Sequence, residues 1–368
     1  MKIVFTGGGS GGHIMPLIAV ARELKRLHGG NDLQLHYIGP KDAFWSLLFR
    51  QEGIVVHSIV GGKIRRYFSF QNFIDIAFKI PFGFLQSIWL LLFINPQLVF
   101  SKGGTGSAAV TYAARFSAIP LFIAESDSVP GLSNRIASKW AKKVFTAFDK
   151  TEYFDLSKTI TVGNPIRKEL LEGDAARAKE VFRLVGGKPL LLFLGGSQGS
   201  EAINDFILLA LNDLLARYEV LHVAGKKNYP VIQSELNMVM DNKLQDYYHL
   251  YESLDEVQSK HAYAAADLII SRSGSGSVFE IAACGKPSIL IPLPSDGHQQ
   301  KNAYQYAQNG AALVIEQQNV TPNFFLGKIN YLISNPQELE AMKQAALAFA
   351  KPLAAKAIAR EILEYLAQ

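Results

Sequence analysis

Short apolar runs alternate along the chain with longer segments in which apolar residues recur every three or four positions. The short runs predict β-strands, and the longer segments predict helices with one buried face. Regular alternation of strand and helix is typical of a parallel sheet with helices on both faces. In the first half, strands are predicted at Ile3–Thr6, Leu33–Ile38, Val55–Ile59, Leu98–Ser101, Leu121–Ala124 and Lys143–Thr146. Helices are predicted between them at Leu17–Leu27, Ala43–Glu52, Phe73–Phe93, Ser107–Ser117 and Leu132–Trp140.

The second half of the chain repeats this scheme. Strands are predicted at Leu190–Leu194, Val220–Ala224, Tyr248–Tyr251, Leu268–Ser271, Ser288–Ile291 and Ala312–Ile315, with helices at Glu201–Tyr218, Leu254–Ala266, Ser277–Cys284, Gln299–Asn309 and from Pro322 to the end. We therefore predict an α/β protein of two doubly wound, Rossmann-like domains. Glycine and proline interrupt the pattern near residues 161–165, which predicts a boundary there. The expected division is an N-terminal domain over residues 1–162, a C-terminal domain over 163–350 and a helix over 351–368 that could pack back on the N-terminal domain.

Composition narrows the functional classes. Hydrophobic residues make up 49% of the 368 positions, which is enough for two cores and excludes a disordered chain. A single cysteine, Cys284, excludes an internal disulfide and argues against a cysteine-based zinc site. The net charge of +5 favours anionic partners, which include phosphorylated substrates, acidic membrane surfaces and nucleic acid. The chain starts with a predicted strand and shows no signal-peptide pattern, so we expect it to remain in the cytosol.

The segment Ile80–Ile94 is strongly apolar and aromatic. It is shorter than the roughly 20 residues that a transmembrane helix needs, and Asp75 and Lys79 are expected to stop it from extending upstream. Two interpretations remain open, a buried core helix and an exposed patch that enters the surface of a membrane. The basic segment at residues 62–66 would supply the cationic rim that such a patch uses on anionic lipid.

Each half begins with an apolar strand that runs into a glycine cluster, at residues 7–12 and 195–199. The first cluster is followed by His13 and lacks the Gly-Lys-Ser/Thr of a P-loop, which excludes an ordinary ATPase. The second strand has no acidic residue at its end to hold a ribose, which argues against a nicotinamide oxidoreductase. His13 starts the first helix beside a loop open enough for a ligand. Because imidazole titrates near neutrality, His13 is the candidate general base for an alcohol; the alternative is a capping histidine.

The stretch from Ser271 to Asn302 is the main candidate for a ligand site. A turn rich in glycine and serine leads into a helix whose positive N-terminal end favours a phosphate. Glu280, one turn into this helix, is placed to accept hydrogen bonds from vicinal hydroxyls such as those of a ribose. Gln299, Gln300 and Asn302 start the next helix at the same edge of the predicted sheet. Together these groups predict a nucleotide-sugar site, although each alone is explained by a capped, solvated helix.

No Asp-x-Asp pair occurs in the sequence. Metal-dependent sugar transferases use such a pair to hold a metal ion on the donor diphosphate, so we expect neither a metal nor another cofactor. Arg167, just after the predicted boundary, and Ser197, in the second glycine cluster, are candidates for supporting a diphosphate instead.

These motifs, in this order, closely resemble the MurG family of membrane-associated transferases, which add N-acetylglucosamine to the lipid-linked precursor of peptidoglycan. The resemblance covers nearly the whole chain. It rests on Gly8-Gly9-Ser10-Gly11-Gly12-His13 with Pro16, Pro130-Gly131-Leu132-Ser133-Asn134, Gly163-Asn164-Pro165-Ile166-Arg167, Gly195-Gly196-Ser197-Gln198-Gly199, Arg272-Ser273-Gly274 with Glu280, and Gln299 with Asn302.

The resemblance implies a GT-B fold, in which two Rossmann-like domains face a cleft, and an inverting transfer that needs no metal. UDP-N-acetylglucosamine would be the donor. The acceptor would be the 4-hydroxyl of the muramyl residue of undecaprenyl-pyrophosphoryl-muramoyl-peptide. The enzyme would be peripheral on the cytoplasmic side of the cell membrane, with an anionic membrane surface as a partner and no nucleic acid.

The resemblance also assigns roles by position. His13 would be the general base, Glu280 would bind the uridine ribose, and the backbone of Leu254 would contact the uracil. The other donor-binding residues would be Ser10, Gly11, Gly12, Asp127, Arg167, Ser197, Ser275, Gly276, Ser277, Val278, Phe279 and Gln299.

Two positions depart from the family pattern. The stretch Ala124-Glu125-Ser126-Asp127 stands where many members have His-Glu-Gln-Asn, so Asp127 places a carboxylate where a neutral amide is usual. Asp127 would then bind a hydroxyl or share the role of base with His13. Gly103-Gly104-Thr105 lacks the usual aromatic residue in a loop expected near the acceptor. The alternatives are a transferase acting on another lipid, such as diacylglycerol, and a non-catalytic membrane scaffold that binds UDP-sugar.

Overall fold

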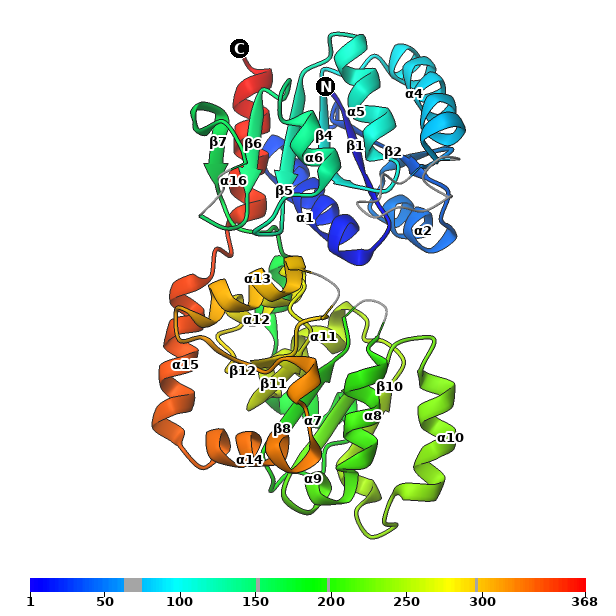
Figure 1. Cartoon of the computed structure of the whole chain (residues 1–368). Helices are drawn as coiled ribbons and strands as arrows, with labels where there is room; N and C mark the ends of the chain where they lie inside the picture. The colour runs from blue at the N-terminus through cyan, green and yellow to red at the C-terminus, as the bar shows by residue number, and fades with distance from the viewer. Residues whose placement is uncertain (63–74, 150–152, 197–198, 295–296) are drawn as a thin grey trace. The chain divides into compact units, whose positions relative to one another are not determined.

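The structure, a computed structural model, describes residues 1–62, 75–149, 153–196, 199–294 and 297–368. It divides into two compact units, Met1–Arg167 with Lys351–Gln368, and Lys168–Ala350. Each unit contains one parallel sheet with helices on both faces (Figure 1). The predicted fold class, α/β with two doubly wound Rossmann-like domains, is therefore confirmed.

The sheet of the first unit has the strand order β3-β2-β1-β4-β5-β6-β7, and every described pair of neighbours is parallel. Its strands are β1 (Lys2–Gly8), β2 (Gln34–Pro40), β3 (Val55–Ile59), β4 (Leu98–Gly104), β5 (Leu121–Glu125), β6 (Lys143–Thr146) and β7 (Thr159–Thr161). Six of these strands were predicted, whereas β7 was missed because only three residues pair with β6.

Helices cover both faces of this sheet: α1 (Gly11–His28), α2 (Ala43–Gln51), η1 (Asp75–Lys79), α4 (Ile80–Ile94), α5 (Ser107–Phe116), α6 (Leu132–Ala137), η2 (Leu156–Lys158) and α16 (Ala354–Leu366). Alternate residues of β1 enter two separate cores. Ile3 and Phe5 pack with α1 and α16, whereas Val4 packs with α4 and α5. Strands buried on both faces are expected in a parallel sheet, which explains the nearly continuous apolar runs in the sequence.

The C-terminal helix α16 completes the first unit rather than the second. Ile358, Ala359 and Ile362 are fully buried in the same core as residues of α1, and the ring of Tyr365 lies 5.1 Å from that of Phe122. The chain therefore returns to its first unit after it has formed the second.

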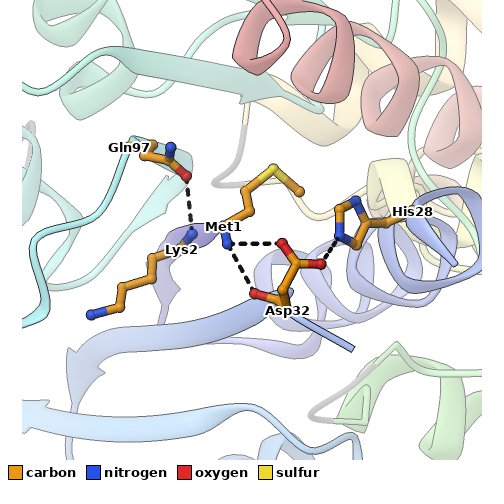
Figure 2. Close-up of polar contacts among 5 residues, drawn as sticks. All are labelled: Met1, Lys2, His28, Asp32 and Gln97. Atoms are coloured by element: carbon orange, nitrogen blue, oxygen red, sulfur yellow. Dashed lines mark hydrogen bonds and ion pairs between the residues drawn. The ribbon is translucent and has the colours of Figure 1, made fainter. Parts of the chain in front are cut away.

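The N-terminus is anchored at the end of the sheet opposite the glycine loops (Figure 2). The Met1 ammonium donates to the backbone oxygen of Asp32 at 2.9 Å and to its carboxylate at 3.3 Å. His28, in the last turn of α1, contacts the other carboxylate oxygen of Asp32 at 2.7 Å. The amide of Lys2 donates to Gln97 Oε1 at 3.2 Å. These contacts fix where β1 starts, and so where its glycine end lies.

The sheet of the second unit has the order β10-β9-β8-β11-β12-β13 and is also parallel. Its strands are β8 (Leu190–Leu194), β9 (Glu219–Val223), β10 (Tyr248–Tyr251), β11 (Leu268–Ser271), β12 (Ser288–Leu290) and β13 (Ala312–Val314). Its helices are η3 (Lys168–Glu172), α7 (Ala175–Phe182), α8 (Glu201–Leu209), α9 (Leu211–Arg217), α10 (Tyr229–Val239), η4 (Gln245–Tyr247), α11 (Glu256–Ala265), α12 (Ser275–Ala283), α13 (Gly297–Ala307), η5 (Gln317–Asn319), α14 (Pro322–Ile333) and α15 (Pro336–Phe349).

Several predicted helices of the second unit were wrong in extent. The helix expected at Glu201–Tyr218 is two helices, because the backbone leaves the helical region at Ala210. The helix expected from Pro322 to the end is three helices, and prolines at 336 and 352 accompany the breaks. Helices α7 and α10 were not predicted. The side chains of His222 and His261 are buried in this unit, at 1% and 3% exposed.

The helical stretch before β4 runs from Asp75 through η1 and α4 to Ile94, close to the predicted Phe73–Phe93. Asp75 and Lys79, which were expected to stop the apolar segment from extending upstream, lie inside this stretch and form an ion pair at 2.8 Å, one turn apart. By length and composition, the window Ala77–Ile94 could cross a membrane, with a mean hydropathy of 1.7 and 22% of the window buried. The predicted basic rim at residues 63–66 lies outside the described residues.

Candidate active site

The glycine loop of the first unit presents His13 at the carboxyl end of β1. Gly9 has φ +97°, a conformation that other residues rarely adopt, and Ser10 is the N-cap of α1. Ser10 Oγ does not cap a backbone amide; it lies 3.0 Å from His13 Nδ1. The backbone amide of His13 donates to Ser10 O at 3.1 Å. The predicted residues Ser10 and His13 are thus brought together, and the imidazole is oriented through Nδ1.

A second glycine turn lies directly against this histidine. Gly103, Gly104 and Gly106 all have φ between +81° and +85°. A Cβ on Gly104 would lie 2.2 Å from Gly8 O and 3.1 Å from His13 Cδ2, so only glycine permits this approach. The loop Gly103-Gly104-Thr105, which the family resemblance placed near the acceptor, therefore lies beside His13, the candidate general base.

Next to these glycines, at the carboxyl ends of the strands, lies a cluster of buried charged side chains that was not predicted from the sequence. Lys102, near the end of β4, is 2% exposed, and its ammonium donates to Ser126 Oγ. Ser126 Oγ in turn donates to Asn164 Oδ1 at 3.1 Å. Burial lowers the pKa of Lys102 to about 8, although Glu125 and Asp127 act to raise it. A lysine inside an otherwise apolar strand was the signal in the sequence that could have revealed this cluster.

Glu125, at the end of β5, organises the loop that carries Asp127. Its carboxylate accepts hydrogen bonds from the amides of Asp127 at 3.1 Å and Gly131 at 3.0 Å, and from Asn134 Nδ2 at 3.0 Å. Burial, and secondly the charge of Asp127, raise the pKa of Glu125. Asp127 itself is half-buried. The predicted site residue Asp127 thus lies beside a second carboxylate and a buried cation.

In the second unit, the starts of α12 and α13 are tied together at the carboxyl edge of the sheet. Ser273 Oγ donates to Gln299 O at 2.8 Å, and Asn302 Nδ2 donates to Ser273 O at 3.4 Å. Ser275 and Gly276 follow in the first turn of α12. The predicted residues of the two motifs therefore converge, with backbone amides and hydroxyls at a helix N-terminus.

Arg272, which was not predicted as a site residue, holds the segments behind the start of α12 together through hydrogen bonds. Its guanidinium is nearly buried and donates to Ile291 O at 3.0 Å, Pro292 O at 3.3 Å and Gln317 Oε1 at 2.7 Å. Burial lowers its pKa. Arg272 therefore joins the ends of β11 and β12 to η5 and fixes the loop in front of α12.

Other predicted donor-binding residues of this unit have different surroundings. Tyr263 OH donates to Glu280 Oε2 at 3.1 Å. The side chain of Glu280, on α12, is half-buried. The side chains of Val278 and Phe279 are buried in the core, so they could contact a ligand only through backbone atoms. Leu254 is half-buried and precedes Asp255, which starts α11 with a capping box.

Three further points concern the predicted site. Ser197 lies outside the described residues, and Arg167 is the last residue of the first segment of the first unit. Gly11 is buried and Gly12 is exposed at the start of α1, whereas Ser277 is half-buried in the first turn of α12. Within the described ranges, no group of three or more His, Cys, Asp or Glu side chains is arranged to hold a metal ion.

The helix α4 exposes an apolar face. Gly83, Ser87, Leu91 and Ile94 form its buried stripe, against α5 and the sheet. The opposite face carries large apolar side chains that are 55–74% exposed: Phe82, Leu85, Trp89, Leu92 and Phe93. Of the two interpretations left open by the sequence, the buried core helix is wrong for this face.

Comparisons with known proteins show the family to which the chain belongs. The model of the glycosyltransferase family 28 N-terminal domain matches residues 3–146, and that of the C-terminal domain matches residues 190–358. A "UDP-N-acetylglucosamine--N-acetylmuramyl-(pentapeptide) pyrophosphoryl-undecaprenol N-acetylglucosamine transferase" of Clostridium tetani is 35% identical over 350 residues, 94% of each chain. The protein of the same name in Clostridium kluyveri is 36% identical over 94% of this chain and 95% of that protein.

A solved structure supports the same assignment. The crystal structure of Acinetobacter baumannii MurG matches with a TM-score of 0.74 and 26% identity, covering 99% of each chain. The chain therefore belongs to glycosyltransferase family 28 and, within it, to the MurG family of glycosyltransferases.

Proposed function

We propose that this enzyme transfers N-acetylglucosamine from UDP-N-acetylglucosamine to the 4-hydroxyl of the muramyl residue of undecaprenyl-pyrophosphoryl-muramoyl-peptide. The observation that carries the proposal is the identity of 35–36% with transferases of that name over 94% of this chain. The paired glycine loops around His13 and the converging polar groups of α12 and α13 support the two halves of the reaction.

The donor is proposed to bind the second unit. Glu280 accepts hydrogen bonds from the ribose hydroxyls, Gln299 binds the sugar, and the backbone near Leu254 contacts the uracil. The diphosphate lies at the N-terminus of α12, where amides from Ser275 to Phe279 and the helix dipole favour negative charge. Arg167 and Ser197 support the phosphates. These groups are amides, hydroxyls and a cation, so the proposed transfer needs no metal ion.

The chemical step is proposed to be a single displacement. His13 accepts the proton of the acceptor hydroxyl, whose oxygen attacks the anomeric carbon while the bond from that carbon to UDP breaks. The configuration at this carbon inverts. Because Nδ1 of His13 is held by Ser10, the proton is accepted at Nε2. Ser10, Gly11 and Gly12 line this side of the site, and the protein contributes mainly by positioning both substrates.

We also propose that the enzyme binds the cytoplasmic surface of an anionic membrane through the exposed face of α4. Large apolar residues that share one side of a surface helix are costly to leave in water. The opposite stripe of α4 packs into its own unit, which supports an orientation along the membrane surface rather than across it. We propose no nucleic acid partner.

Replacing Leu85 and Leu92 together by serine tests the membrane proposal. Each leucine that enters the interface contributes about 1.5 kcal/mol, so the double variant should bind anionic phospholipid vesicles roughly 100-fold more weakly. Leu209→Ser, on α8 of the other unit, is the matched control because this leucine is also highly exposed. Sedimentation with vesicles measures the affinities. Equal binding by wild type and the double variant would contradict the proposal.

The proposed reaction is tested by turnover with radiolabelled UDP-N-acetylglucosamine and two lipid acceptors, analysed by thin-layer chromatography. We expect label to enter the muramyl-peptide lipid and not diacylglycerol, because the family identity extends over both units. Transfer to diacylglycerol alone would establish the alternative transferase. Binding of UDP-N-acetylglucosamine without transfer to either lipid would indicate a non-catalytic scaffold.

A further inference from the structure

The buried lysine of the first unit has an incomplete set of partners. An ammonium has three N–H donors, and within the described residues the only hydrogen-bond acceptor of Lys102 is Ser126 Oγ. Lys102 is 2% exposed, so bulk water does not complete the set. A buried charge without sufficient compensation is costly, so the charges around it must supply most of its stabilisation.

Two carboxylates lie near this ammonium. Its hydrogen-bond acceptor, Ser126, stands between Glu125 at the end of β5 and Asp127 in the following loop, and the Glu125 carboxylate accepts a hydrogen bond from the Asp127 amide. The charges of both carboxylates act to raise the pKa of Lys102 against the effect of burial. Glu125 is already committed to three hydrogen bonds that hold its own loop. A cation beside these two carboxylates offsets part of their negative charge, which weakens the repulsion between Asp127 and a phosphorylated substrate.

The position of the cluster connects it with the site rather than with general stability. Lys102 immediately precedes Gly103 and Gly104, and Gly104 lies against His13. A Cβ on Gly7, in the first glycine loop, would lie 3.2 Å from Lys102 Cβ. The base of the Lys102 side chain therefore lies between both glycine loops, at the carboxyl edge where parallel sheets bind ligands.

We propose that Lys102 and Asp127 form a compensating charge pair, in which the buried ammonium balances the charge of the Asp127 carboxylate while that carboxylate accepts a hydrogen bond from a substrate sugar hydroxyl. This inference rests on the proposed transferase function. Lys102 is in this sense a positioning residue, because it acts through Asp127. The pair also accounts for the departure of this chain from the neutral amide usual in the family: the added negative charge comes with a buried positive one.

The test is a double-mutant cycle of Lys102→Met and Asp127→Asn, measured as kcat/KM for transfer. With Asp127 present, K102M should reduce kcat/KM roughly 100-fold; with D127N present, it should reduce it no more than about fivefold. Lys143→Met is the matched control, because Lys143 pairs with Glu361 at the other end of the sheet. The effects of K143M and D127N on kcat/KM should be additive in free energy, with no coupling between the two substitutions. A loss from K102M that is the same with and without D127N would overturn the proposal.

A second measurement needs no Lys102 variant, so it remains informative if K102M fails to fold. The pKa of Lys102 is about 8, and its deprotonation removes the compensation, so wild-type kcat/KM should fall above about pH 8. Because the lysine acts through Asp127, its deprotonation in D127N should reduce kcat/KM by no more than about fivefold, so the alkaline limb should be much shallower than in wild type. The charged groups that act on Lys102 in the described chain are Glu125 and Asp127, and Glu125 is unchanged in D127N. An alkaline limb of the same depth in both proteins would contradict the pair.

Failure of the pair and failure of the proposed function give different results. Denaturant unfolding measures the same cycle without any substrate, and K102M should lower the folding equilibrium constant more with Asp127 than with D127N. If wild type transfers no sugar but this coupling is present, the transferase function fails and the charge pair stands. If wild type is active and neither cycle shows coupling, the charge pair fails and the function stands.

Discussion

Replacing His13 by alanine should lower the rate of sugar transfer by about 10³-fold, within the range expected for loss of a general base. The affinity for UDP-N-acetylglucosamine should remain unchanged, because His13 belongs to the first unit and the proposed donor-binding residues, apart from the first glycine loop, Asp127 and Arg167, belong to the second. Single-turnover kinetics with saturating substrates measure the chemical step, and calorimetric titration of the donor measures binding.

Ser10→Ala is the informative control for this prediction. It removes the hydroxyl 3.0 Å from Nδ1 but keeps the imidazole, so the transfer rate should fall by only about tenfold. A His13→Ala enzyme that transfers sugar at the wild-type rate would remove His13 from the mechanism. A His13→Ala enzyme that loses donor binding and rate together would instead place the histidine in the donor site.

Replacing Glu280 by alanine should weaken binding of UDP by roughly 10- to 100-fold, because a carboxylate that accepts hydrogen bonds from hydroxyls contributes about 1.5–3 kcal/mol. The rate at saturating donor should change by less than about threefold, because a ribose contact is the same in the ground state and the transition state. Calorimetric titration with UDP and with 2′,3′-dideoxy-UDP provides the measurement.

Comparison of UDP with 2′,3′-dideoxy-UDP distinguishes the loss of a ribose contact from a general disruption of the binding site. Wild type should lose affinity when the hydroxyls are absent, whereas Glu280→Ala should bind both ligands equally weakly. Tyr263→Phe is the matched control, because it removes the hydroxyl that donates to Glu280 at 3.1 Å and keeps the carboxylate. If the Glu280→Ala enzyme still preferred UDP by the wild-type factor, the ribose assignment would be wrong.

The sequence predicted most strands because each combines an apolar run with a glycine or polar break at its end. It also predicted the two glycine loops, in which Gly9, Gly196 and Gly199 have positive φ, and the glycine- and serine-rich turn before α12. Strand β7 was missed because its residues are few and only half-buried. The extent of α8 and α9 was wrong because the break at Ala210 involves no glycine or proline.

The site residues that the sequence could not reveal act through contacts between distant segments. Lys102, Ser126 and Asn164 belong to three separate stretches, and only the folded sheet brings them into one hydrogen-bonded chain. Arg272 was visible in a motif, but its three acceptors lie between 19 and 45 positions away. The exposure of α4 was likewise undecidable, because an apolar composition is the same whether a helix faces the protein core or its surface.

The return of α16 to the first unit has a consequence for how the protein is made. Until Ile358 and Ile362 have left the ribosome, one flank of α1 has no covering partner, although the central strands beneath it were synthesised much earlier. Multidomain chains usually complete their domains in order of synthesis. Here the second unit is whole at Ala350, so it can mature first, and the leading unit must wait for α16 before it can close its core.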